Sequence, residues 1–188
     1  MGYRAAALAL AVIALASAGC GASAQNQAPS TQAVQASFKD SPPRLASLHQ
    51  QANQLLPGGT GAFSARLAEL RGYPVVVNKW ASWCGPCQSE FPAFQKAGVT
   101  YGRRVAFIGL NGKDQNGSAA AFLRRFPVTY PSYVDPGESI ARSIQAATFY
   151  PLTIYFDRNG KQVFDHAGPY ASASALERDI RRYALGTQ

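Results

Sequence analysis

The chain has few residues of the kinds that metal sites and disulfide frameworks need. Its 188 residues include only three cysteines, two histidines and one methionine. A structural zinc site takes about four cysteine or histidine ligands, and neither His49 nor His166 has a second histidine near it in the sequence. We therefore expect no metal site and no bound cofactor. A disulfide-rich scaffold is excluded as well.

Acidic residues are also scarce, with 10 against 18 lysines and arginines and a formal net charge of +8. The basic residues are scattered, apart from short pairs at 103–104, 124–125 and 181–182. No dense basic run or interleaved aromatic pattern accompanies them, so nucleic-acid binding is not predicted. We keep one role for this charge as an alternative, which is attraction of the protein to an anionic membrane surface.

A hydrophobic run long enough to span a bilayer is missing too. Residues 5–16 are continuously apolar and follow a short basic start, which is the length and order of a signal peptide. We expect residues 1–19 to be that signal. This signal predicts that the protein is exported. It would then be located at the outer face of the cell membrane as a lipoprotein, or be secreted into the periplasm or medium.

Two processing sites compete at the end of this segment. Residues 18–20 resemble a bacterial lipobox, in which Cys20 would be lipidated and would anchor the chain to the membrane, although Ser17 weakens the match. Residues 22–24 instead fit the small-x-small rule, with cleavage after Ala24. In either case the odd cysteine is lipidated or removed, and a single cysteine pair is left in the mature chain.

The rest of the chain is predicted to hold one domain at residues 62–188, preceded by a tether and short helix at residues 20–61. Residues 25–41 are rich in glutamine, alanine, serine and threonine, which is typical of a flexible tether. Leucine and alanine spacing predicts a helix over 44–56, ended by a Pro-Gly-Gly break.

Hydrophobic periodicity gives the order of elements within the domain. We predict helices at 62 to about 70, 87–97 and 118–126, and buried strands at 75–77 and 105–110 between them. A short strand and a helical turn are expected within 132–144. A hairpin of 152–156 and 161–166 follows, and then a last helix capped by Ser174. Parallel strand–helix units followed by a hairpin indicate an α/β fold whose mixed central sheet has helices on both faces.

The motif that carries chemistry lies between the strand at 75–77 and the helix that follows it. Cys84 and Cys87 are three residues apart, and Cys84 is expected to open the helix. Unpaired N–H groups and the positive dipole end at a helix N-terminus stabilise a thiolate, which is the nucleophile of disulfide exchange. Cys87, one turn further on, is placed to attack a mixed disulfide and release the substrate.

Other interpretations of this pair are weaker. Half of a zinc site would lack its other ligands. A purely structural disulfide that closes so short a loop adds little stability. A thiol peroxidase would need a threonine and an arginine clustered around Cys84, and the sequence near it shows neither. A copper-binding chaperone on the same fold remains an alternative.

Two stretches resemble a known family. Trp83-Cys84-Gly85-Pro86-Cys87 matches the thioredoxin active-site signature, and the longer string at 75–92 resembles the TlpA/ResA-like branch of exported thiol–disulfide oxidoreductases. The resemblance covers residues 62–185. It implies a thioredoxin fold with an N-terminal extension, an enzyme that works through a redox-active Cys84–Cys87 disulfide, and no cofactor.

The resemblance also implies roles for further residues. Asn78 stands where related proteins carry a buried acid, and Glu90 matches an acid that this branch often keeps, so both are expected to tune the pKa values of the thiols. Tyr150-Pro151 matches the cis-proline loop. Substrate binding is expected from these two residues and the motif residues Trp83, Gly85 and Pro86. Lys79 replaces an apolar residue, so we expect its strand to have one face less buried.

The function implied is extracytoplasmic thiol–disulfide exchange, in the direction that reduces disulfides of exported proteins, apocytochrome c among them during cytochrome c maturation. Partners would be exported proteins that carry disulfides or dithiols, and an upstream membrane electron donor. A disulfide-introducing oxidase on the same fold is the alternative within the same chemistry. Nothing in the sequence decides the oligomeric state.

Overall fold

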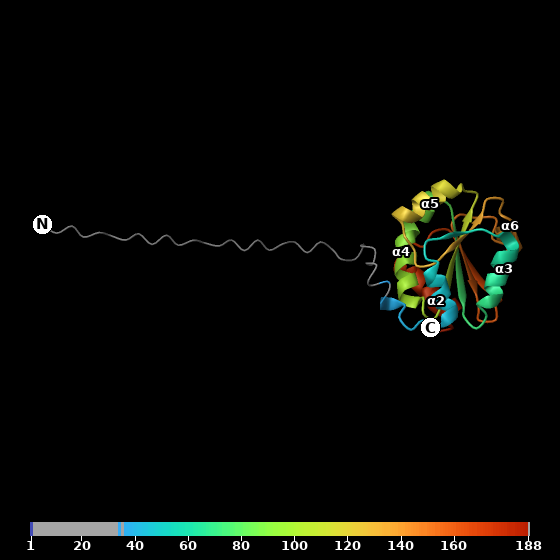
Figure 1. Cartoon of the computed structure of the whole chain (residues 1–188), viewed down its shortest axis with the longest axis horizontal. Helices are drawn as coiled ribbons and strands as arrows, with labels where there is room; N and C mark the ends of the chain where they lie inside the picture. The colour runs from blue at the N-terminus through green and yellow to red at the C-terminus, as the bar shows by residue number, and fades with distance from the viewer. Residues whose placement is uncertain (2–33, 35, 188) are drawn as a thin grey trace.

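A computed structural model of the chain describes residue 1, residue 34 and residues 36–187 (Figure 1). Six strands form one mixed sheet in the order β1-β4-β3-β2-β5-β6. The strands are β1 (Leu55–Leu56), β2 (Val75–Trp80), β3 (Ala106–Gly112), β4 (Ser132–Asp135), β5 (Leu152–Phe156) and β6 (Gln162–Ala167). The helices are α2 (Pro43–Gln50), α3 (Gly59–Glu69), α4 (Gly85–Tyr101), α5 (Asn116–Arg125), α6 (Ser139–Ser143), α7 (Ala173–Asp179) and the π-helix η1 (Ile180–Leu185).

Central strand β2 joins the parallel and antiparallel halves of the sheet. It pairs in parallel with β3, which in turn pairs in parallel with β4, and it pairs antiparallel with β5, the first strand of the β5–β6 hairpin. The predicted α/β class with a mixed sheet is confirmed. The predicted hairpin also forms, and Gly160 in its turn has a φ of +79°, a backbone conformation that favours glycine.

The alternation of side chains along β2 divides the core into two layers. Val76 and Trp80 belong to one buried cluster, which also contains residues of α4, α5 and α7. Val75 and Val77 point the other way, into a cluster with residues of α2, α3 and α6. Figure 1 shows α4 and α3 on opposite sides of the sheet, so helices cover both faces as predicted.

The N-terminal part of the fold differs from the prediction. The helix expected over 44–56 ends at Gln50, and residues 55–56 form β1 instead, paired with β4. Asn53 lies between them at a φ of +65°, a left-handed conformation that a continued helix would not allow, and its Oδ1 accepts a hydrogen bond from Val128 N–H. Leu45 and Leu48 are buried, so core packing begins upstream of residue 62.

Two further expectations are corrected. Lys79 does not leave its strand half-exposed, because every residue of β2 is buried and the lysine itself is 0% exposed. The last helix is capped by Ser172, whose Oγ accepts a hydrogen bond from Ala175 N–H, whereas Ser174 lies inside the first turn. Serine is a favoured N-cap residue, so either position could cap the helix by residue type. The extended backbone of Ser172 is what makes it the cap.

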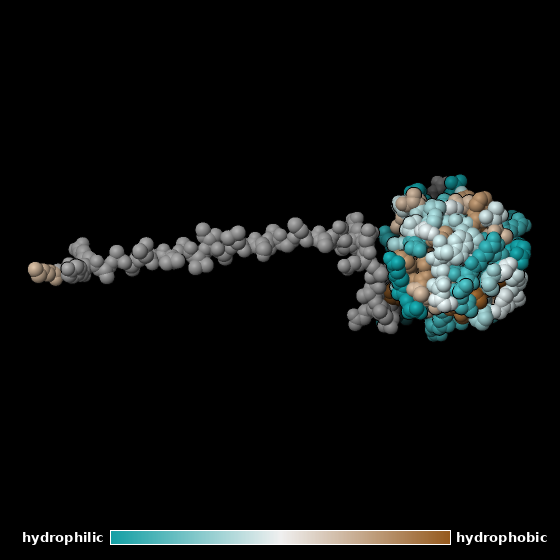
Figure 2. Space-filling model, turned by 90° about the horizontal axis from the view of Figure 1, so that it is seen from above, coloured by the Kyte–Doolittle hydropathy of each residue, from teal (hydrophilic) through white to brown (hydrophobic). Residues whose placement is uncertain are grey.

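The expected signal segment lies outside the described residues, and so do Cys20 and Ala24. Within the part of the chain that the structure describes, no helix is both long and apolar enough to cross a membrane. Hydrophilic and hydrophobic residues are interspersed on the face of the domain seen in Figure 2.

Candidate active site

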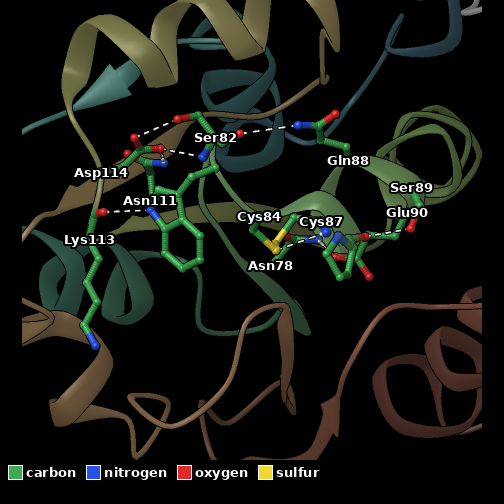
Figure 3. Close-up of a disulfide and its surroundings, with 12 residues drawn as sticks. Asn78, Ser82, Cys84, Cys87, Gln88, Ser89, Glu90, Asn111, Lys113 and Asp114 are labelled. Carbon is green, nitrogen blue, oxygen red and sulfur yellow. Dashed lines mark hydrogen bonds between the residues drawn. A yellow bond between two sulfur atoms is a disulfide. The ribbon is translucent and has the colours of Figure 1, made fainter.

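A disulfide joins Cys84 and Cys87 at the start of α4, with an S–S distance of 2.04 Å (Figure 3). Cys84 has an extended backbone and occupies the N-cap position, and Gly85 and Pro86 form the first turn of the helix. The Cys87 N–H donates to Cys84 Sγ across 3.1 Å, so the sulfur fills the place that a serine or aspartate oxygen takes in other helices. The helix start therefore directs a donor and its positive dipole end at this sulfur.

The two cysteines are both buried but differ slightly in exposure. Cys84 is 4% exposed and Cys87 is 0% exposed, while Trp83 beside them is 56% exposed. Cys84 therefore keeps a small exposed fraction and Cys87 has none. This order of burial is the one that the predicted roles of the two cysteines require.

The loop that leads into the motif is held by Asp114, which lies between β3 and α5. The Asp114 carboxylate accepts hydrogen bonds from Ser82 N–H at 2.6 Å and from Ser82 Oγ at 2.8 Å (Figure 3). It also accepts one from Asn111 Nδ2. Burial acts to raise the pKa of Asp114, but these hydrogen bonds outweigh it and hold the pKa below its ordinary value. An ionised carboxylate therefore fixes the backbone two residues before Cys84.

Trp83 is held by contacts on two sides. Its indole Nε1–H donates to the Lys113 carbonyl at 2.8 Å, and its ring packs on Tyr150 with 5.1 Å between centroids. The Tyr150–Pro151 peptide bond is cis, as the resemblance predicts. Phe149, next along the chain, is 53% exposed. Trp83 and Tyr150 thus form an aromatic contact directly beside Cys84.

An ion cluster contacts Tyr150, with Lys79 and Glu138 buried and Lys113 mostly exposed. Lys79 Nζ lies 2.8 Å from Glu138 Oε1 and 3.9 Å from the centroid of the Tyr150 ring, and it donates to the Ala146 carbonyl. Lys113 Nζ contacts the other Glu138 oxygen at 2.9 Å. The Tyr150 hydroxyl donates to Glu138 Oε1 at 2.8 Å, so the same carboxylate holds two lysines and the tyrosine.

This arrangement keeps Glu138 ionised. Burial acts to raise the pKa of Glu138, but hydrogen bonds from Lys79, Lys113 and Tyr150 lower it to about 2. Glycine is required at Gly112 in the same cluster, because a Cβ there would overlap the Tyr150 hydroxyl. The residue before the cis proline is therefore fixed by charge, hydrogen bonding and close packing together.

A second buried carboxyl group, Glu90, lies on the inner side of the disulfide. It is one helical turn after Cys87 and shares its face of α4, and both side chains are 0% exposed. Asn78 Nδ2 donates to Glu90 Oε1 at 2.9 Å, and Tyr170 N–H donates to Glu90 Oε2 at 3.1 Å. Burial raises the pKa of Glu90 to about 7, although both hydrogen bonds act to lower it. This carboxyl group can gain or lose a proton near neutral pH.

Two buried polar atoms close to Glu90 have no hydrogen-bond partner among the described residues: Asn78 Oδ1 and Thr153 Oγ1. Asn78 and Thr153 face each other across the β2–β5 pair. Such atoms cost free energy when they are left unsatisfied, and they cluster in proteins where chemistry needs them. The polar interior beneath Cys87 therefore extends from Glu90 across two strands.

The structure thus brings the predicted site residues Asn78, Trp83, Gly85, Pro86, Glu90, Tyr150 and Pro151 into the end of the domain that carries the disulfide. Cys20 lies outside the described residues. Sequence reasoning missed Asp114 and Glu138, which come from segments without a motif. The unexpected lysine at position 79 was the only signal, because a lysine within an apolar strand requires a buried partner.

The described residues contain no cluster of three or more histidine, cysteine, aspartate or glutamate side chains that could hold a metal ion. A metal bound at this site would have to use Cys84 and Cys87 after reduction, since their sulfurs are joined to each other here.

Comparison with known proteins gives consistent matches. Residues 52–163 match the AhpC/TSA family. The thiol-disulfide oxidoreductase ResA of Geobacillus kaustophilus is 29% identical over 121 residues, which cover 63% of this chain and 65% of that protein. The thiol:disulfide interchange protein DsbE of Pseudomonas fluorescens biotype C is 37% identical over 75 residues, 40% of each chain. This chain therefore spans less than two thirds of the length of these curated relatives.

Solved structures agree on the fold. A structure assigned as the thiol:disulfide interchange protein DsbE from Chlorobium tepidum is 29% identical, with a TM-score of 0.57 over 63% of this chain and 84% of that chain. A secreted disulfide oxidoreductase of Mycobacterium tuberculosis is 20% identical with a TM-score of 0.55, covering 61% of this chain and 85% of that one. The second likeness supports the fold alone.

Proposed function

The chain belongs to the AhpC/TSA family, and from this premise we propose that it is a thiol–disulfide oxidoreductase that works through Cys84 and Cys87. The observation that carries the proposal is the disulfide at the start of α4, with Cys84 at the N-cap and the fully buried Cys87 one turn inside the helix. The helix N-terminus stabilises Cys84 as a thiolate once the bond is reduced. The names of the ResA and DsbE relatives support the same chemistry.

In the reducing direction, the Cys84 thiolate attacks one sulfur of a substrate disulfide. A bond forms between Cys84 and the substrate, and the other substrate sulfur leaves as a thiolate. Cys87 then loses its proton and attacks Cys84 Sγ, which forms the intramolecular disulfide and releases the second substrate thiol. The substrate gains two electrons, and the protein must regain them from an external dithiol donor. The oxidising direction is the same sequence reversed.

Glu90 is proposed as the group that exchanges a proton with Cys87. The buried thiol cannot lose its proton to water directly, and Glu90 is the titratable group on the same helix face. A pKa near 7 suits this role, because the group can accept a proton and return it at neutral pH. Asn78 orients the carboxyl group through its 2.9 Å hydrogen bond.

Substrate binding is proposed at the exposed aromatic surface around the disulfide. Trp83 and Tyr150 form one wall, and Gly85 and Pro86 leave the approach to Cys84 free of bulky side chains. Backbone groups at Pro151, the first residue of the segment leading into β5, are proposed to pair with an extended substrate strand.

The setting is proposed to be outside the cytoplasm. The support is the signal-like sequence at residues 1–19 and the choice between lipidation at Cys20 and cleavage after Ala24. We propose that the physiological direction is reduction of exported proteins, apocytochrome c among them, with electrons supplied by a membrane protein. The names of the ResA and DsbE relatives support the thiol–disulfide chemistry of this proposal.

Two measurements test the function. A Cys87→Ser variant should accumulate a mixed disulfide with a substrate protein. A Cys84→Ser variant should form no mixed disulfide and should lose disulfide reductase activity. If Cys84→Ser keeps its activity, the mechanism is wrong. Hydroperoxide turnover and Cu(I) binding, measured on the same samples, separate a peroxidase or a copper chaperone from an oxidoreductase.

The direction is tested by the midpoint potential of the Cys84–Cys87 pair in defined thiol buffers. A value near or below about −250 mV would place the pair with reductants. A value above roughly −150 mV would make the protein an oxidant that introduces disulfides.

A further inference from the structure

A hollow of about 480 Å³ lies at the end of the domain opposite the disulfide. Its lining includes three arginines from three separate segments: Arg44 in the first turn of α2, Arg71 between α3 and β2, and Arg158 in the β5–β6 turn. Tyr73, Gly72 and Pro43 complete the lining, so no acidic residue faces the hollow. Such a volume is in the range of small-ligand sites.

Hydrogen bonds hold these segments together. Arg44 Nη1 donates to the Arg71 carbonyl at 2.9 Å, which fixes one guanidinium at the rim. Gly72 N–H donates to the Arg158 carbonyl at 2.8 Å, which ties the turn before β2 to the hairpin. The arginines are thus gathered by the fold, although they are 27 or more positions apart in the sequence.

The three guanidinium groups lack a directly paired carboxylate within the described part of the chain. None of them takes part in an ion pair there. None of the acids nearest in sequence lines the hollow. Asp157 Oδ1 accepts the N–H groups of Asn159 and Lys161, and Asp40 is exposed four residues before Arg44. Glu69 lies 3.8 Å from Arg66 in an adjacent hollow that Arg44 also lines. Three cations around one hollow repel one another, and an anion bound among them offsets that repulsion.

We propose that this hollow, the arginine hollow, binds a phosphate-type oxyanion. Guanidinium groups present paired N–H donors that match the oxygens of a phosphate, and several of them around one site give both charge and geometry. The same chemistry is offered by inorganic phosphate and by the headgroup of an anionic phospholipid.

The position of the hollow favours the lipid headgroup. Strand β2 begins two residues after Tyr73 and ends near Cys84, so the hollow and the disulfide lie about 20 Å apart along it. Pro43 lines the hollow and directly follows the N-terminal segment expected to be the tether, and Figure 1 shows α2 at the end of the domain away from α5. Docked by this face, the domain would point its disulfide away from the membrane. This orientation rests on the proposed export and membrane anchoring of the chain, whereas the proposed oxyanion site is independent of them.

The test compares the full chain with Arg44→Gln/Arg71→Gln/Arg158→Gln. The control is Arg124→Gln/Arg125→Gln/Arg142→Gln, which removes the same charge from exposed positions on α5 and α6. In one arm, the thermal unfolding temperature in inorganic phosphate is compared with that in chloride at equal ionic strength. In the other, sedimentation with phosphatidylglycerol vesicles is compared with phosphatidylcholine vesicles. All samples carry the same N-terminal segment, so its own affinity for lipid cancels.

We expect phosphate to raise the unfolding temperature of the parent and the control, and this response to disappear in the hollow variant. Binding to anionic vesicles should fall about tenfold further in the hollow variant than in the control. Loss of the phosphate response alone would support the oxyanion site and overturn the lipid assignment. Equal behaviour of both variants in both arms would overturn the proposal. Both variants should keep their disulfide reductase activity on a protein in solution. A negative result for the arginine hollow can therefore be told apart from a negative result for the proposed function.

Discussion

Asn78 Nδ2 lies 2.9 Å from Glu90 Oε1, and both side chains are buried beneath the disulfide end of α4. The two residues come from different elements, β2 and α4, and among the described residues neither side chain is hydrogen-bonded to an ionisable side chain other than Glu90 itself. The pair joins the sheet to the helix that carries both cysteines. Its chemistry can be tested separately from that of the cysteines.

Glu90→Gln should make stability less dependent on pH. The folded pKa of Glu90, about 7, is above its ordinary value of 4.5. Protonation therefore favours the folded state: the contribution is fully present below pH 4.5, is lost as the pH rises to 7, and is constant above that. The parent should lose about 3 kcal/mol relative to the variant over this window.

Denaturant unfolding of the oxidised proteins from pH 4 to pH 8 measures this difference. Glu69→Gln is the control, because that glutamate is mostly exposed. A difference between parent and Glu90→Gln that stays flat with pH would contradict the assignment. In the reduced proteins, Glu90→Gln should also slow the attack of Cys87 on a mixed disulfide, while Glu69→Gln should not.

Breaking the Lys79–Glu138 pair should destabilise the protein strongly. Glu138→Gln leaves Lys79 buried without its counter-charge, and the expected cost is about 3–5 kcal/mol. Lys79→Met should cost less, since Lys113 still pairs with Glu138. The double variant Lys79→Met/Glu138→Leu should be more stable than Glu138→Gln alone, because no buried charge is left unpaired.

Urea unfolding of the three variants checks this order. Fluorescence of Trp83 should change along with it, since the Tyr150 ring packs on Trp83 and its hydroxyl loses a charged acceptor. Equal stability of Glu138→Gln and the parent would show that the ion cluster does not hold the loop.

Asp114→Ala should loosen the approach to Cys84. The substitution removes the acceptor of Ser82 N–H and Ser82 Oγ, at a cost of about 1–3 kcal/mol. We expect faster alkylation of Cys84 in the reduced protein together with lower stability. The control is Asp165→Ala, on the exposed side of β6. If Asp114→Ala alkylates at the parental rate, the brace is not needed to position the motif.

Ser172→Ala should destabilise α7 by about 0.5–1 kcal/mol, because the Ala175 N–H loses its capping acceptor. Ser174→Ala removes a hydroxyl of the same size from the first turn and should have a smaller effect. Thermal unfolding of the two variants separates the cap seen in the structure from the one expected from sequence spacing. A larger effect at position 174 would favour the spacing.

Much of the architecture follows from local patterns. Runs such as 75–77 and 105–110 are apolar and β-branched enough to predict buried strands, and Asn159-Gly160 predicts the hairpin. The helix predicted over 44–56 was wrong in its second half, since leucines that suit a helix there are used to pair β1 with β4. A two-residue strand depends on its partner, which no local pattern reveals.

The sequence by itself indicated the Cys84–Cys87 pair and its place at a helix start, because both depend on residues adjacent along the chain. Its resemblance to a known family indicated the cis-proline loop. Only the tertiary structure decided what surrounds them. Asp114 and Glu138 became part of the site, and Arg44, Arg71 and Arg158 came to line one hollow, through packing of segments far apart in sequence. The physical reason is that burial raises the pKa of Glu90 and makes Lys79 need a charged partner, and burial exists only once the chain has folded.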